Sequence, residues 1–173
     1  MKRLFISILI ITYSSILNAQ LKLDNIEIRP KNNAYLTIGG ADGALISLNY
    51  ERLFLTSEKF FITAKIGAGY NEQFRLCILG PCSPPIKKYF IITEHLTTDF
   101  GKGKSFFEVG LGSTIICGVA STNVLIYPIL AYRIQPLVSK KILFRISLGF
   151  PIFNYDNIEL IFLPIGFSVG GSF

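Results

Sequence analysis

Apolar and polar residues alternate with a period of two along most of this chain. The last eleven residues, 163–173, show the pattern clearly. Ile165, Phe167, Val169 and Phe173 fall on one parity, and the other parity carries proline, glycine and serine. Alternate side chains of a β-strand point to opposite faces of a sheet. The pattern therefore predicts a strand with one apolar face and one small or polar face.

Seven earlier runs repeat this alternation, and turn-rich breaks separate them. The eight predicted strands cover residues 34–40, 44–53, 60–70, 89–100, 106–115, 123–135, 142–152 and 163–173. The breaks after the second, fourth and sixth strands are short and polar, whereas those at 71–88 and 153–160 are longer. The break after the fourth strand is a turn expected at 99–104 (DFGKGK), which overlaps the last two residues of that strand. Short turns at one end and long loops at the other are typical of membrane barrels with an even number of strands. We therefore predict an all-β fold, an eight-stranded antiparallel up-and-down transmembrane β-barrel.

Composition agrees with a chain that exposes apolar surface. Half of the 173 residues are hydrophobic and 16% are charged, against roughly 25% charged in a soluble domain. The length suits one domain. Alternation alone would also fit a soluble barrel or sandwich with the apolar face turned inward. The positions of the charged residues favour the membrane barrel.

Five charged residues lie singly on the polar parity of five different predicted strands: Glu51, Lys65, Glu108, Arg133 and Arg145. The interior of an eight-stranded barrel is just wide enough to be filled by side chains. An unpaired buried charge costs several kcal/mol, so charges there must pair. We therefore expect a structural ion-pair network that fills the interior and blocks conduction. A narrow channel is the alternative.

The amino terminus has the features of an export signal. Two basic residues precede an apolar stretch at 4–13, and cleavage is expected after Ala19. Residues 20–32 would then form a periplasmic leader, or add one short strand, and 33–173 would form the barrel. Together with the predicted barrel, this leads us to expect the mature protein in the outer membrane of a Gram-negative cell. An exported chain is not expected to bind nucleic acid.

A membrane-spanning helix is the competing interpretation of one stretch. Residues 115–132 contain no charge and are long enough to span a bilayer as a helix. The same stretch includes Gly118 and Pro128, which disfavour a helix interior. A helix there would also leave the apolar faces of the last two strands without a partner.

The fourth predicted strand is the least regular and carries the only histidine. Glu94 falls on the apolar parity, so either a β-bulge shifts the register or Glu94 lies near the lipid headgroups. Some small outer-membrane barrels are lipid-modifying enzymes that use a histidine with a serine and an acid, which makes His95 a candidate. Glu94 would point to the opposite face, however, and the chain has no G-x-S-x-G motif. We expect no catalysis and keep a lipid-modifying enzyme as an alternative.

Three cysteines lie in or near the predicted outer loops. Cys77 and Cys82, within 71–88, could form a disulfide in the oxidising envelope. Cys117 is left over and could pair with either. No histidine lies at ligand spacing, so we expect no metal and no cofactor. The apolar tip of the 71–88 loop could fold over the barrel mouth or contact an extracellular partner.

Four short stretches of the chain are SLNYERLF (47–54), FFEVGLGST (106–114), YRIQP (132–136) and LFRISLGFP (143–151). These stretches resemble a family of small, mostly uncharacterised outer-membrane β-barrel proteins that is common in Bacteroidota-type bacteria. The last strand, which ends on an aromatic residue, is similar to the closing strand by which the barrel assembly machinery recognises such proteins. The resemblance implies outer-membrane lipid and that machinery as partners, and it brings no catalytic residues. The expected role is structural or in surface interaction.

Overall fold

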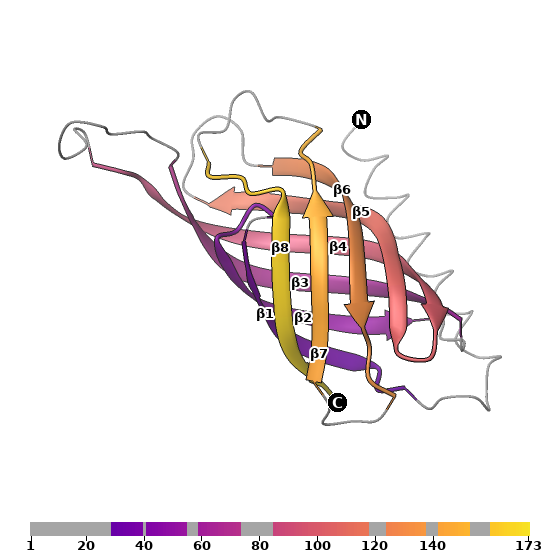
Figure 1. Cartoon of the computed structure of the whole chain (residues 1–173). Helices are drawn as coiled ribbons and strands as arrows, with labels where there is room; N and C mark the ends of the chain where they lie inside the picture. Colours follow the sequence, from indigo (N-terminus) through magenta and orange to yellow (C-terminus); the bar gives the residue numbers. More distant parts are fainter. Residues whose placement is uncertain are drawn as a thin grey trace, which may run out of the picture.

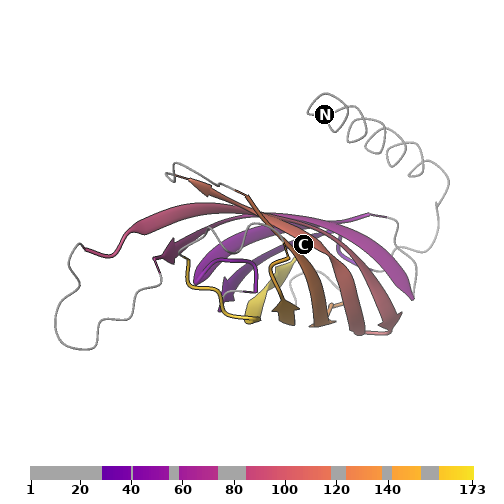
Figure 2. The ribbon, with the colours of Figure 1, turned by 90° about the horizontal axis from the view of Figure 1, so that it is seen from above.

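The computed structural model describes residues 29–39, 41–54, 59–73, 85–117, 124–137, 142–152 and 160–173. Within these ranges eight antiparallel strands each pair with the next, and β8 pairs with β1 to close a barrel (Figures 1 and 2). The strands are β1 (Asn32–Ile38), β2 (Ile46–Phe54), β3 (Phe60–Glu72), β4 (Lys88–Lys102), β5 (Ser105–Cys117), β6 (Val124–Ile134), β7 (Ile142–Gly149) and β8 (Ile165–Ser172). The predicted all-β, eight-stranded antiparallel barrel is confirmed.

The closing strand pairs with the first strand, as the pattern predicted. The ladder between β1 and β8 runs from Asn33 opposite Ser172 to Ile38 opposite Phe167. It is extended by two backbone hydrogen bonds that Asn32 and Phe173 exchange, at 3.1 and 2.8 Å. Phe173 is therefore bonded into the wall of the barrel.

Some boundaries differ from the prediction. We expected a turn at 99–104, but β4 continues to Lys102 and only Gly103 and Lys104 form the turn. Gly103 has a φ of 63°, a conformation that glycine adopts without a steric penalty. The helix considered for 115–132 is wrong for the part of it that is described, because β5 reaches Cys117 and β6 begins at Val124. No helix among the described residues is long and apolar enough to span a bilayer.

The strands are strongly tilted relative to the barrel axis. A row of paired residues starts at Phe54, the last residue of β2, and passes through Ile62, Thr98, Val109, Leu130 and Leu148. It ends at Ile165, the first residue of β8. The row thus begins at the end of the barrel that holds the short turns and finishes at the opposite end. Such a stagger is what closing a small barrel requires.

The two faces of the wall differ sharply in polarity. The outer face is apolar around all eight strands, with exposed residues such as Leu36, Leu48, Ile66, Leu96, Leu111, Leu130, Ile142 and Phe167. The inner face carries most of the buried polar side chains, including Asn33, Thr37, Asn49, Thr63, Thr93, Thr97, Thr114, Ser147 and Ser168. The alternation in the sequence therefore corresponds to apolar residues outside and polar residues inside.

Candidate functional site

A buried ion-pair network occupies the interior of the barrel near the end with the short turns. Arg133 on β6 binds Glu51 on β2, with 2.5 Å between Nη2 and Oε1. Arg145 on β7 binds Glu108 on β5 through two bonds, Nε to Oε2 at 2.8 Å and Nη2 to Oε1 at 2.5 Å. Arg133 Nη1 lies 3.8 Å from Glu108 Oε2 and links the two pairs. These four side chains are at most 1% exposed.

Several members of this network were not identified from the sequence. Asp99 on β4 lies 3.4 Å from Arg133 Nη1, although the pattern placed Asp99 in a turn. Asn33 donates to Glu51 Oε1 at 2.7 Å, and Tyr35 donates to Glu51 Oε2 at 3.1 Å. Each of these residues shares the polar parity of its strand. The alternation therefore predicts that these residues face the interior, but it does not predict which residues they bind.

The fifth predicted charge, Lys65, forms its ion pair elsewhere. Its Nζ lies 3.0 Å from Oδ2 of Asp42, and both side chains are nearly inaccessible to solvent. Asp42 belongs to the connection between β1 and β2, which the sequence pattern marked only as a turn. The Asp42 carboxylate also accepts hydrogen bonds from Ser47 Oγ at 3.1 Å and from the Ala44 backbone at 3.3 Å. Lys65 therefore anchors a loop and not another strand.

This loop folds into the mouth of the barrel. The carbonyl oxygen of Asp42 accepts hydrogen bonds from Thr114 Oγ1 at 2.6 Å and from Tyr127 OH at 3.2 Å, across on β5 and β6. Ala41 and Ala44 are buried beside it. A cluster that includes Ile91 and Leu160 fills the space around Ala44. The described interior is therefore closed at the loop end by packing and at the turn end by ion pairs.

His95 is an interior residue held by an aromatic neighbour. Its Nε2 lies 3.0 Å from Tyr127 OH, and the two rings meet edge to face with centroids 5.6 Å apart. Its Nδ1 has no hydrogen-bond partner within the described part of the chain. Glu94 lies on the opposite, outer face and cannot orient the ring. Among the residues that the structure describes, no serine hydrogen-bonds to His95.

Glu94 lies on the apolar outer wall without any shift of register. The β3–β4 ladder is continuous from Glu72 opposite Lys88 to Phe60 opposite Phe100, so the bulge considered for this strand is absent from the described ladder. Ser113 on β5 donates a long hydrogen bond to Glu94 Oε2, at 3.4 Å. Glu94 is therefore a carboxylate exposed on a hydrophobic surface.

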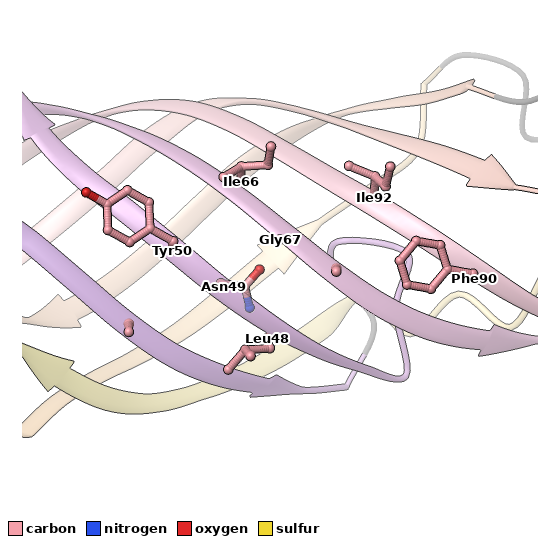
Figure 3. Close-up of a pocket in the computed structure, with 9 residues that line it drawn as sticks. Leu48, Asn49, Tyr50, Ile66, Gly67, Phe90 and Ile92 are labelled. Carbon is pink, nitrogen blue, oxygen red and sulfur yellow. The ribbon is translucent and has the colours of Figure 1, made fainter.

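An apolar groove of about 450 Å³ lies on the same wall (Figure 3). It crosses β1 to β4, where the small outer-face residues Ala34 and Ala68 leave space between larger side chains. The larger side chains that border it include Leu48, Tyr50, Ile66, Phe90 and Ile92. The groove therefore opens on the outer surface, and the interior residue Asn49 contributes to its lining.

The remaining predicted site residues are placed as follows. Ile165, Phe167, Val169 and Phe173 all face outward and are 45–58% exposed. Cys77 and Cys82 lie outside the described residues, so their pairing is a prediction only. Cys117, at the end of β5, is an exposed free thiol. No group of three metal-ligating side chains occurs among the residues that the structure describes.

The fold and the interior network together define a class, a closed eight-stranded antiparallel β-barrel with a buried polar network and an apolar outer wall. Comparison with protein-family models, curated proteins and solved structures finds no match for this chain.

Proposed function

We propose that this protein is an outer-membrane β-barrel with a structural or surface-interaction role, and that it neither conducts solutes nor catalyses a reaction. The observation that carries this proposal is the apolar outer face on all eight strands. A soluble eight-stranded barrel would turn that face inward. A lipid environment accommodates it without the cost of exposing apolar surface to water.

The spacing of aromatic residues on the outer wall supports a membrane position. Phe60 and Phe100 are paired near the turn end of β3 and β4, and Tyr70 and Phe90 are paired near the loop end. The two rows are ten positions apart along each strand. At about 3.4 Å per residue and a tilt of roughly 40°, they lie about 25 Å apart along the barrel axis. This matches the apolar band of outer-membrane barrels between its two aromatic girdles.

The closed interior supports a structural role over a channel. A conducting pore needs a continuous water-filled path, whereas the described lumen is occupied by the ion-pair network and by the Asp42 loop. The ion-pair network joins different strands, and the loop is held by hydrogen bonds from β3, β5 and β6 to Asp42. They stabilise the barrel and leave it closed.

Cell fractionation combined with gel electrophoresis tests the proposed location. We expect the protein in the outer-membrane fraction, with an unboiled sample that migrates differently from a boiled one. A protein in the soluble fraction that shows no heat-dependent shift would refute the barrel-in-membrane proposal. Conductance across a planar bilayer separates the structural role from the channel, because a closed barrel gives no steady current.

The enzyme alternative has its own test. Lipid A from a strain carrying His95→Ala should have the same mass spectrum as lipid A from the parent strain. A changed spectrum would instead assign a lipid-modifying activity to this histidine.

The β3–β4 hairpin supports a surface-interaction role. Backbone pairing within the hairpin continues past the two strands, with a hydrogen bond of 2.9 Å from Gln73 N to Lys87 O. Gln73 also forms a bridge with Leu160, which precedes β8. The two sides of the hairpin extend beyond the other strands (Figures 1 and 2). Replacing residues 75–83 with a short glycine-serine linker should abolish binding of an extracellular partner and leave barrel assembly unchanged.

A further inference from the structure

The two ends of the barrel differ in charge. Four lysines and one glutamate occur in the sequence of the connections at the turn end, which are 55–59, 103–104 and 135–141. Two basic and three acidic residues occur in the connections at the loop end, which are 39–45, 73–87, 118–123 and 150–164. The turn end is therefore the basic end of the molecule.

Three exposed lysines form a cluster where β3 begins and where β4 turns into β5. The members of this lysine cluster are Lys59, Lys102 and Lys104. The backbone N–H of Gly101 donates to the carbonyl oxygen of Lys59 at 2.9 Å, which joins β4 to the start of β3 at this point. Lys102 lies in register opposite Ser105, and Lys104 lies in the tight turn between them. The three lysines thus occupy adjacent positions on the rim of the barrel.

The acids that the structure describes at the turn end do not neutralise this cluster. They are Glu51, Asp99 and Glu108, which are buried and bind arginines inside the barrel. None of the three lysines forms an ion pair with a residue in the described ranges. Glu58 precedes Lys59 and lies outside those ranges, and its single charge offsets one lysine of three. The lysine cluster therefore keeps a net positive charge.

The depth of the cluster on the barrel matches the level of lipid headgroups. Lys59 directly precedes Phe60, and Lys102 follows Phe100 by two positions on the same outer face. The rings of Phe60 and Phe100 lie against each other, with centroids 5.3 Å apart. At about 3.4 Å per residue and a tilt of roughly 40°, Lys102 lies about 5 Å beyond Phe100 along the barrel axis. Aromatic rows mark the edges of the apolar band, so the lysines lie just outside it.

We propose that the lysine cluster binds the phosphate groups of anionic phospholipids in the leaflet that the short turns reach. This inference rests on the proposed membrane location. A lysine ammonium is a compact charge with three donors, so it binds a phosphate oxygen without a shaped pocket. Each basic residue close to an anionic lipid surface strengthens association by about fivefold. A zwitterionic headgroup attracts the cluster less, because its own cation offsets the phosphate.

The position of Lys102 favours a lipid over a soluble anion. Its backbone belongs to the outer face of β4, in line with Phe100 and the apolar wall. The apolar stem of a lysine in such a place lies along the hydrophobic surface, and its ammonium group extends to the headgroup layer. A soluble anion would not cover the wall beside it, whereas a phospholipid covers the wall with its chains and meets the ammonium with its phosphate.

Native mass spectrometry of the full-length mature protein, titrated with phosphatidylglycerol in micelles of an uncharged detergent, tests this site. Phosphatidylcholine with the same acyl chains is the zwitterionic comparison. We expect the wild type to bind phosphatidylglycerol at least about fivefold more tightly than phosphatidylcholine. The double variant Lys102→Gln with Lys104→Gln should bind phosphatidylglycerol at least about fivefold more weakly than the wild type, because two of the three charges are gone. Its affinity for phosphatidylcholine should not change.

The double variant Lys87→Gln with Lys88→Gln is the matched control. It also removes two exposed positive charges, but at the loop end, where Lys88 lies in register opposite Glu72. Its affinity for phosphatidylglycerol should stay within about twofold of the wild-type value. Heat-dependent gel migration of each variant shows that the barrel itself has folded.

Three outcomes overturn the lipid site. The first is a wild type that fractionates with the outer membrane and binds both lipids equally, which leaves the proposed location standing. The second is an unchanged preference for phosphatidylglycerol in the turn-end double variant. The third is an equal loss in both double variants, since the net charge of the whole protein would then set the preference. A protein outside the membrane fraction refutes the proposed location itself.

Discussion

Replacing Arg145 with methionine tests whether the interior network is as inaccessible to water as the structure indicates. Arg145 makes two bonds to Glu108 at 2.5 and 2.8 Å, and both side chains are 1% exposed. Removing one partner of a buried pair costs roughly 3–5 kcal/mol, because the other charge is left without compensation. Glu108 keeps a contact with Arg133 at 3.8 Å, so we expect a loss of about 3 kcal/mol, at the lower end of that range.

The double variant Glu108→Leu with Arg145→Met removes both charges. Replacing a whole buried pair by apolar residues is often close to neutral, so its free energy of unfolding should lie within about 1 kcal/mol of the wild-type value. Arg52→Met is the control, since Arg52 is exposed on the outer face near the turn end and should change stability by less than about 1 kcal/mol.

Urea unfolding in lipid vesicles, followed by far-UV circular dichroism, measures these changes. The chain contains no tryptophan, so intrinsic tryptophan fluorescence is not a usable probe. An Arg145→Met variant as stable as the wild type would refute the reasoning, because it would mean that water reaches Glu108. A double variant less stable than the single one would refute it as well.

Three further predictions concern other parts of the barrel. Gly112→Ala should destabilise by about 1–3 kcal/mol in the same unfolding assay, because the new methyl group would lie 2.7 Å from Cζ of the Tyr127 ring. The control Gly171→Ala should not, since nothing lies within 4 Å of its added carbon. Asp42→Asn should lower stability by roughly 2–3 kcal/mol, because it leaves Lys65 buried without its counter-charge, and a Lys65→Met replacement in that background should restore most of the loss. Deleting Phe173 should reduce the amount of folded, heat-modifiable protein in membranes, because the two backbone bonds that extend the β1–β8 ladder past Ser172 are lost.

The number and type of strands were predictable because their signal is local. Each strand can be recognised from its own alternation of apolar and polar residues, which arises wherever one face of the strand is apolar and the other is polar. Boundaries were less certain: β4 passes through Asp99 and Phe100, which the composition of DFGKGK had marked as a turn. The ladder with β5 continues through these residues to Lys102 opposite Ser105. The turn that remains is tight and needs only the positive φ of Gly103.

The interior site was predictable only in part. Parity placed Glu51, Glu108, Arg133 and Arg145 on the inner face, and the structure brings these four together. Which acid meets which base depends on the stagger of the strands around the barrel, because residues far apart in the chain come to the same level. The stagger cannot be read from the sequence pattern of any single strand.

The sequence by itself determined that this chain forms eight two-faced strands, because a period of two is a property of neighbouring residues. Only the tertiary structure decided that Asp42 folds inward to meet Lys65, that Asp99 joins Arg133, and that Glu94 faces outward within an unbroken ladder. The physical reason is the closure of the barrel. Closing eight tilted strands sets which side chains share a level, and buried charges must then find their partners among those neighbours.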